Sequence, residues 1–450
     1  MADEGFRFIH ATDLRLDEPL VGVGANGPGI GSSGKMSGDE SHALVDATLT
    51  AWNLVVEHCV SAQADFLLLT GNVFDHRSLS LRARIALERG LATLDSNRIE
   101  VFIAPGNLDP ATAWKRQVSL PGNVSLLGTE ESDPVAVVKH GRMLTSIQTL
   151  ATTETEEPGW NANSGANETS SNGGYRIGVV PAGVPVQWKN GQPESLNVPG
   201  ASPFAATLVQ SAIENGVNYV ACGAGQPQLK QAGPTWIHDP GPTQSIRSTV
   251  AGPCGCSLVQ VDSHGRTRID SLALAPVRWE TFFLEIEKQA TLKDVVEKMA
   301  LQVMELNVSE CEDVWVLNWR LSGEGKTLEA FLDPSQLPQI WEQLEEELEE
   351  ELSGDGHTLR IHQCELVQRV LRDPVSLEDA TGLIQSLQEL LESEENSNAA
   401  KSVVEEVRRE LIEDQWLQRA DMFQVREVIA SANSEDVIQR ALDSAGLYLD

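Results

Sequence analysis

The chain has 450 residues, 41% of them hydrophobic, and a formal net charge of −33. This length and composition predict a globular protein with two or three domains and an ample core. The negative charge is concentrated in residues 277–450, which hold 15 basic side chains against 39 acidic ones. Because binding to nucleic acid requires patches of lysine and arginine, this balance opposes free-standing affinity for DNA.

Neither the N-terminus nor any later segment indicates a membrane or a secretory route. No apolar run approaches the roughly 20 residues that span a bilayer, and the start, MADEGFRFIHATD, lacks the basic and apolar regions of a signal peptide. We therefore expect a cytoplasmic protein.

Of the six cysteines only Cys254 and Cys256 are close in sequence, and no second pair completes a zinc site. We therefore expect reduced, buried thiols.

The first hundred residues alternate predicted strands and helices. The apolar patterns indicate strands in FRFIHATDL, DFLLLTG and IEVFIAPG and helices over 40–63 and about 79–97. Ser37 and Glu40 are spaced as a capping box near the start of the first helix. This β-α-β-α-β order predicts an α/β fold with a parallel, layered sheet, whose functional loops follow the carboxyl ends of its strands.

A second run of strands follows, in VAVVKH, RMLTSIQTL, YRIGVVPA and VNYVACGAG. Residues 152–174 between them are rich in Gly, Asn and Ser, which predicts a surface loop.

The segment GIGSSGKM, residues 29–36, is similar to a phosphate-binding P-loop. However, it lacks a Ser or Thr after Lys35 and follows no apolar strand, so we interpret it as a flexible loop.

The pattern changes after residue 276. Strands and helices over 277–372 predict a compact α+β capping domain, and residues 373–450 predict a helical tail. The acidic run EEELEEEL, residues 345–352, is typical of the solvated face of a helix. Amphipathic spacing in the tail permits intramolecular packing, a homodimer or a partner-binding segment.

Five loops follow predicted strands, and they read HATDLRLDEPL, LLLTGNVFD, APGNLD, VVPAGVP and ACGAGQPQ. In this order they resemble the metallophosphoesterase superfamily, and specifically its SbcD/YhaO-type DNA-repair exonuclease branch. That branch has D-x-H-L-D, G-D-x-x-D, G-N-H-D, a lone histidine and a closing G-H-x-H. The resemblance extends over about residues 6–280 and, in outline, over the C-terminal third. It implies a calcineurin-like β-sandwich flanked by helices.

Carried over by position, the resemblance retains few of the family's metal ligands. Asp13 matches a ligand of the first metal and Asn107 a ligand of the second, while Leu108 stands where the family has its catalytic histidine. Asp75 and Asp109 remain, and in the family such residues mostly brace the loops. Five expected ligands are replaced, by Arg15, Asn72, Pro181, Ala224 and Gln226.

These replacements oppose metal binding. Asn72 cannot offer a charged oxygen to each of two cations, and Leu, Pro and Ala carry no donor atom in the side chain. Arg15 places a permanent positive charge where a dication would lie. Arg15 either replaces the first metal electrostatically, by pairing with Asp13 or Asp75, or extends into solvent. His10 and His76 are weak candidates for a rearranged mononuclear site.

The resemblance also implies partners. We expect a catalytically degenerate protein that needs no cofactor and serves as a binding or scaffolding subunit of an SMC-like (SbcC/YhaN-like) ATPase, with DNA contacted through the complex. The alternative is a weak or mononuclear phosphodiesterase or DNA exonuclease that uses Asp13, Asn107 and Arg15 with Mn²⁺ or Mg²⁺.

A basic stretch comprises Arg77, Arg82, Arg84 and Arg89. It favours either a DNA-facing surface or a solvated helix face.

Overall fold

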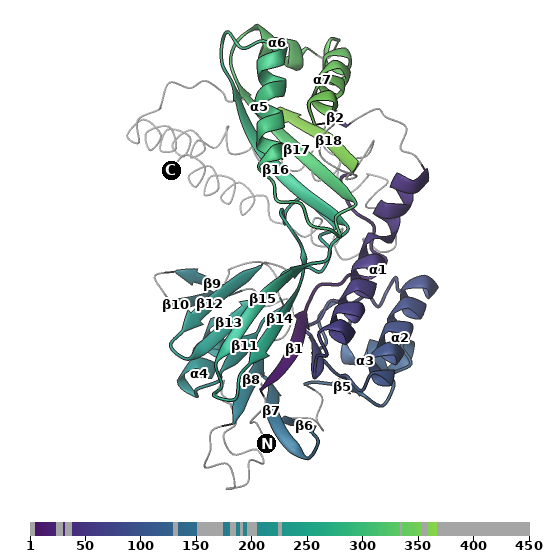
Figure 1. Cartoon of the computed structure of the whole chain (residues 1–450), viewed down its shortest axis with the longest axis vertical. Coiled ribbons are helices and arrows are strands. Elements are labelled where there is room, and N and C mark those ends of the chain that lie inside the picture. Colours follow the sequence, from purple (N-terminus) through teal and green to yellow (C-terminus); the bar gives the residue numbers. More distant parts are fainter. Residues whose placement is uncertain are drawn as a thin grey trace, which may run out of the picture. The chain divides into compact units, whose positions relative to one another are not determined.

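The computed structural model describes residues 5–23, 30–31, 38–128, 134–150, 174–180, 186–189, 192–195, 205–223, 227–333, 335–352 and 359–366. They belong to one compact unit, Met1–Val367 (Figure 1). The surface loop predicted at 152–174, apart from its last residue, and the helical tail predicted at 373–450 lie outside the described residues.

The first sheet has the strand order β15-β14-β1-β3-β4-β5. The three predicted strands, β1 (Phe6–Ala11), β3 (Phe66–Leu69) and β4 (Glu100–Ile103), are parallel as expected, and β5 (Val124–Leu126), which was not predicted, continues the parallel half beside β4. Helices α1 (Gly38–Ser61), α2 (Leu81–Ser96) and α3 (Ala111–Gln117) lie between these strands in the chain. An antiparallel hairpin, β14 (Gly255–Val261) and β15 (Thr267–Ala273), extends the sheet beside β1, and the sequence patterns did not predict this pairing.

The second sheet has the order β12-β13-β11-β8-β7-β6. Its strands are β6 (Val135–Lys139), β7 (Arg142–Thr149), β8 (Tyr175–Val179), β11 (Tyr219–Ala221), β12 (Gln228–Ala232) and β13 (Thr235–Asp239). Helix α4 (Ala205–Glu214) precedes β11, and β9 (Val186–Lys189) pairs with β10 (Gln192–Ser195). The β12–β13 hairpin and α4 were not predicted.

Aromatic side chains join the two sheets into a sandwich. The Phe8 ring stacks on Phe66 in the same sheet, with centroids 4.7 Å apart, and meets the edge of Tyr219 in the other sheet at 5.4 Å. All three side chains are buried in one cluster that both sheets contribute to. The predicted layered α/β sandwich is thus confirmed.

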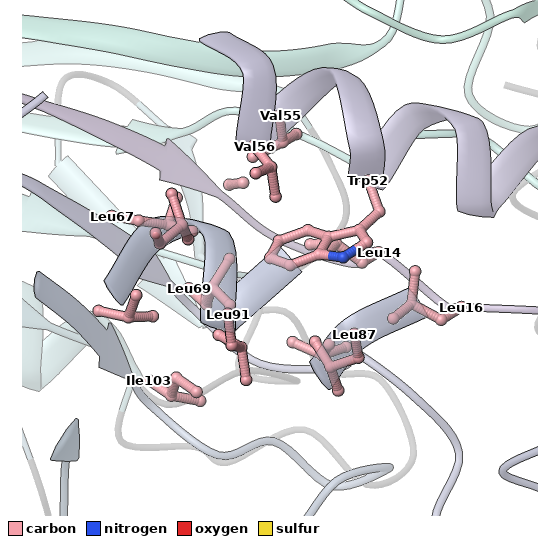
Figure 2. Packing of buried hydrophobic residues seen from close by; sticks show 14 of the residues in the cluster. Leu14, Leu16, Trp52, Val55, Val56, Leu67, Leu69, Leu87, Leu91 and Ile103 are labelled. Atoms are coloured by element: carbon pink, nitrogen blue, oxygen red, sulfur yellow. The ribbon is translucent and has the colours of Figure 1, made fainter. Parts of the chain in front are cut away.

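On its other face the first sheet is covered by α1 and α2, which meet at Trp52. Figure 2 shows the Trp52 indole among leucines from the strands and from α2. Its Nε1 donates a hydrogen bond to the Ala86 carbonyl at 3.1 Å. A Cβ at Gly90 would lie 2.6 Å from the indole, so the close approach of the helices requires glycine there.

Residues after 276 build a smaller sheet, ordered β16-β17-β18-β2. Strands β16 (Val277–Ile286), β17 (Val314–Gly323) and β18 (Leu359–Leu366) are parallel, and β2 (Ile30–Gly31) pairs with β18 in the antiparallel sense. Helices α5 (Leu292–Met304), α6 (Lys326–Leu332) and α7 (Leu337–Glu351) complete a separate core around Trp319, Phe331 and Trp341. A functional capping domain over 277–372 stays a prediction.

Two further observations concern the cysteines and membranes. All six cysteines are free, and five of them are buried. Within the described ranges, no helix combines the length and the apolar character needed to cross a bilayer.

Candidate functional site

Loops after β1, β3 and β4 come together at one edge of the first sheet. The Asp13 N–H donates to the Gly71 carbonyl at 3.2 Å, and the Arg15 N–H donates to the Asn72 carbonyl at 3.1 Å. The Asp109 carboxylate, from the third loop, accepts the Asn72 N–H at 2.8 Å. The three loops predicted to carry the chemistry are therefore joined through their backbones, as expected for the carboxyl ends of neighbouring parallel strands.

The backbone of these loops is strained. Asp13, Arg15 and Asn72 have φ values of 50°, 44° and 55°, in the left-handed region that residues other than glycine rarely adopt. Such a conformation costs about 1–3 kcal/mol per residue and persists only where surrounding contacts impose it. Strain of this kind concentrates at functional sites, so these loops are the candidate site of the fold.

Asp109 holds the loops in place. Its carboxylate accepts four hydrogen bonds, from the backbone N–H groups of Asn72, Val73 and Gly106 and from Trp114 Nε1, at 2.8 to 3.2 Å. Burial raises the pKa of Asp109 to about 6, while these donors favour the ionised form. A Cβ at Gly106 would lie 2.7 Å from Asn72 Oδ1, so the loop after β4 packs tightly on Asn72.

At the centre of the site, Asp13 is occupied by neighbouring donors. Asn72 Nδ2 donates to Asp13 Oδ1 at 2.7 Å, and Arg15 Nε lies 3.7 Å from the same oxygen. Arg15 also donates from Nη1 to Glu18 Oε2 at 3.2 Å. Burial raises the pKa of Asp13, and the Arg15 charge and the Asn72 hydrogen bond oppose that rise. Arg15 thus pairs with Asp13 and Glu18. This arrangement favours the hypothesis that the Arg15 charge stands in for a first metal ion over the hypothesis that its side chain extends into solvent.

Asp75, the other partner considered for Arg15, forms its contacts elsewhere. Its two carboxylate oxygens accept hydrogen bonds from Nε and Nη2 of Arg77, at 3.1 and 3.0 Å. His76 Nδ1 donates to the Leu108 carbonyl at 2.8 Å and so ties the second loop to the third. The residue that sequence reasoning missed is Glu18, whose only signal is its spacing of three residues from Arg15.

The described residues do not fit a pair of metal ions. Asn72 turns an N–H toward Asp13 where the family's bridging carboxylate would offer oxygen, and Leu108 supplies no donor atom. Asn107 is exposed, and Pro181, Ala224 and Gln226 lie outside the described residues. In the part of the chain that the structure describes, no three His, Cys, Asp or Glu side chains gather as a metal site.

His10 lies beneath the loops, inside the sandwich. Its Nδ1 and Nε2 form hydrogen bonds with Tyr219 Oη at 2.9 Å and Thr70 Oγ1 at 3.0 Å. Burial, and then the nearby His238, lower the pKa of His10. His238 itself bonds through Nε2 to Ser257 Oγ at 2.8 Å. This internal network of neutral histidines has satisfied partners, so it supports the core.

The predicted basic stretch is partly neutralised. Arg82 pairs with Asp17 and Asp46, and Arg77 pairs with Asp75. Arg84 and Arg89 are exposed on α2. Half of the stretch therefore braces the fold, which leaves a weaker surface for DNA than four free arginines would form.

One of the comparisons with known proteins agrees with the class of protein that the loops indicate. No protein-family model matches the chain. A curated protein described as "Uncharacterized metallophosphoesterase YhaO", from Bacillus subtilis (strain 168), is 23% identical over 349 residues, covering 75% of this chain and 78% of that protein. This similarity supports a place for the chain in the metallophosphoesterase superfamily.

Solved structures show a more distant likeness. The crystal structure of TT1561 from Thermus thermophilus is 13% identical with a TM-score of 0.33, and it covers 59% of this chain and 99% of its own. A dimetal phosphatase from Danio rerio is 10% identical with a TM-score of 0.33, and it covers 57% of this chain and 92% of its own.

Proposed function

We propose that this chain is a catalytically degenerate member of the metallophosphoesterase superfamily that serves as a binding or scaffolding subunit. One observation carries the proposal. Asn72, at the position of the bridging carboxylate, donates its amide to Asp13, and Arg15 pairs with the same carboxylate. Together these contacts use the acceptor that a first metal ion would need.

Electrostatics supports this proposal. Asp13, Arg15 and Glu18 together carry at most one negative charge, whereas two divalent cations bring four positive charges. A dication about 4 Å from the Arg15 guanidinium would be repelled by about 8 kcal/mol at an effective dielectric constant of about 20. Two carboxylates that are already paired with Arg15 cannot offset that repulsion for two ions. The residues instead form a closed set of hydrogen bonds and ion pairs that includes Glu18.

We further propose the partners that the loop motifs imply. The chain would work with an SMC-like coiled-coil ATPase and reach DNA through the complex, with the tail over 373–450 as the partner-binding segment. The net charge of −33 supports DNA contact lent by a partner over contact by this chain alone. A homodimer is the other assembly that the amphipathic tail permits.

Metal analysis combined with an activity assay tests the loss of catalysis. The purified full chain is incubated with Mn²⁺, desalted and analysed for metal, and then assayed with bis(p-nitrophenyl) phosphate and with DNA. We expect far less than one ion per chain and no turnover that depends on Asp13. A matched variant that restores ligands, Arg15→His with Asn72→Asp and Leu108→His, should retain more Mn²⁺ than the natural chain.

Stoichiometric metal together with turnover abolished by Asp13→Ala would contradict this proposal. That result would favour the alternative, a weak or mononuclear phosphodiesterase or DNA exonuclease. In that case Asp13 and Asn107 would bind a single Mn²⁺ or Mg²⁺ ion, and Arg15 would bind the substrate phosphate.

Affinity capture tests the partner. The tagged full chain, expressed in its own cells, should retain a long coiled-coil ATPase. Val407→Asp with Leu411→Asp, which places charges in the predicted apolar stripe VVEEVRRELI, should release it, whereas Glu410→Gln should not. Capture without any coiled-coil ATPase, or capture unchanged by the paired aspartates, would refute this assignment.

A further inference from the structure

A cavity of about 1200 Å³ lies at the opposite edge of the first sheet from the degenerate site. Its lining includes residues at the start of β1 and residues immediately before β3 and β4, together with the turn that joins β14 to β15. The degenerate loops follow the other ends of the same parallel strands. Since these strands have four to six residues, the two places are separated by about 13–20 Å. We call this space the basal cavity.

The lining of the basal cavity is cationic in a strongly acidic chain. Two carboxylates line it, those of Asp65 and Asp262, against five basic side chains: Arg7, Arg98, Lys139, Arg266 and Arg268. The chain as a whole has twice as many acidic as basic residues, with 66 against 33. The local balance is therefore the reverse of the global one, as expected of a place that attracts anions.

The two carboxylates are already used within the fold. Asp65 accepts the Arg7 N–H at 2.8 Å and pairs with Lys139. Asp262 accepts the backbone N–H groups of His264 and Arg266, at 2.8 and 2.9 Å, and so forms the β14–β15 turn. The charge of Asp65 is therefore paired with Lys139, and Asp262 acts on the nearby Arg266 charge without forming an ion pair with it.

Three guanidinium groups form no ion pair with a carboxylate of the described residues. Arg7 Nη1 donates to a neutral acceptor, the Ala62 carbonyl, at 3.1 Å. The side chains of Arg98 and Arg266 form no ion pair within the described ranges, and both are exposed at the cavity. Arg98 also has a φ of 59°, a left-handed conformation that glycine or asparagine would adopt at lower cost. The fold thus holds an arginine at a strained position beside the cavity.

The arrangement of these arginines indicates the shape of an anion that would contact them. Arg7 lies on β1, Arg98 precedes β4, and Arg266 precedes β15. In the order β15-β14-β1-β3-β4, each outer arginine is two strands from β1, or about 10 Å. An elongated ligand with several phosphates can contact all three positions at once, and guanidinium forms paired hydrogen bonds with phosphate oxygens.

We propose that the basal cavity binds a linear chain of phosphate groups across Arg98, Arg7 and Arg266. The source of such a chain is either inorganic polyphosphate or the backbone of a short single-stranded nucleic acid. The inference does not rest on the proposed loss of catalysis, because the basal cavity shares no residue with the degenerate site.

Binding is measured on the full natural chain at low and physiological salt. A dye-labelled oligothymidine is titrated by fluorescence anisotropy, and sodium polyphosphate is titrated by calorimetry. The cavity variant is Arg98→Gly with Arg266→Gln, in which glycine also relieves the strained φ, so folding is preserved. The control is Lys115→Gln with Arg116→Gln, which removes the same charge from exposed positions on α3.

We expect the cavity variant to weaken binding about tenfold or more and to reduce its salt dependence, because two phosphate contacts are lost. The control variant should change affinity less than about twofold, because only screened charges are removed. Binding of one source alone would support the site and identify that source. The proposal is overturned if neither source binds at low salt, if both variants weaken binding equally, or if polyglutamate of matched charge competes as well as polyphosphate.

Discussion

Asn72→Asp, which introduces the carboxylate that the loop motifs lead one to expect at this position, should strongly destabilise this protein in the absence of metal. The new carboxylate would replace the amide that lies 2.7 Å from Asp13 Oδ1, in a buried place. Two unit charges at this distance repel by about 6 kcal/mol at an effective dielectric constant of about 20. The hydrogen bond from the amide, worth about 1 kcal/mol, is also lost.

Protonation limits this penalty and makes it depend on pH. At about pH 7.5, protonating one carboxyl with an unperturbed pKa of about 3.9 costs about 5 kcal/mol, and at about pH 5 it costs about 1.5 kcal/mol. The pair's pKa is raised in the folded state, so stability is highest below the unfolded pKa and is lost as pH rises through the folded pKa. We expect a loss of about 3–5 kcal/mol at pH 7.5 and about 1–2 kcal/mol at pH 5.

Urea unfolding of both proteins in EDTA at these two pH values gives the free energies of unfolding. Asn107→Asp is the matched control, because it adds the same charge on an exposed residue of the neighbouring loop and should change stability by less than about 0.5 kcal/mol. An Asn72→Asp protein as stable as the natural chain at pH 7.5, or a penalty equal at both pH values, would refute this account of the site.

Three other substitutions test separate parts of the fold. Asp109→Asn should lower the free energy of unfolding by about 3 kcal/mol, because four N–H donors lose their carboxylate; unchanged thermal unfolding would contradict the bracing role. Burial lowers the pKa of His238 to about 4, so its contribution to stability is present above about pH 6.5 and is lost as pH falls through about 4. The free energy of unfolding of His238→Gln should therefore fall less steeply with decreasing pH below about 6.5 than that of the natural chain. An equally steep fall would contradict this. Gly90→Ala should cost about 1–3 kcal/mol in urea unfolding, because its Cβ would press on Trp52; a neutral effect would show that α2 shifts freely.

Local sequence predicted much of the first sheet. The apolar run of β3 and the strand-helix alternation led to the right parallel order, because local hydrophobic pattern and connection rules act over short stretches. The hairpins β12–β13 and β14–β15 were missed. Their partly exposed strands carry polar residues such as Lys230 and Asp270, so pairing with a neighbouring strand, and not periodicity, decides their structure.

For the candidate site, sequence could name positions but not partners. Motif spacing drew attention to Asp13, Arg15 and Asn72, which the structure brings together. It could not show that Arg15 contacts Glu18 and not Asp75, because that choice depends on side-chain directions in strained loops. The role of Asp109 as acceptor of Asn72, 37 residues away, likewise depends on three loops meeting.

The sequence by itself determined which residues stand in the loops after the strands, including the neutral Asn72 and the cationic Arg15. Only the tertiary structure decided what those side chains do. Asn72 engages Asp13 because β1 and β3 are neighbours, whereas Arg15 reaches Asp13 within one strained loop. The basal cavity likewise gathers Arg7, Arg98 and Arg266, which are far apart in the chain. Local pattern encodes strands and helices, whereas charge clusters arise from which chain segments the sheet places side by side.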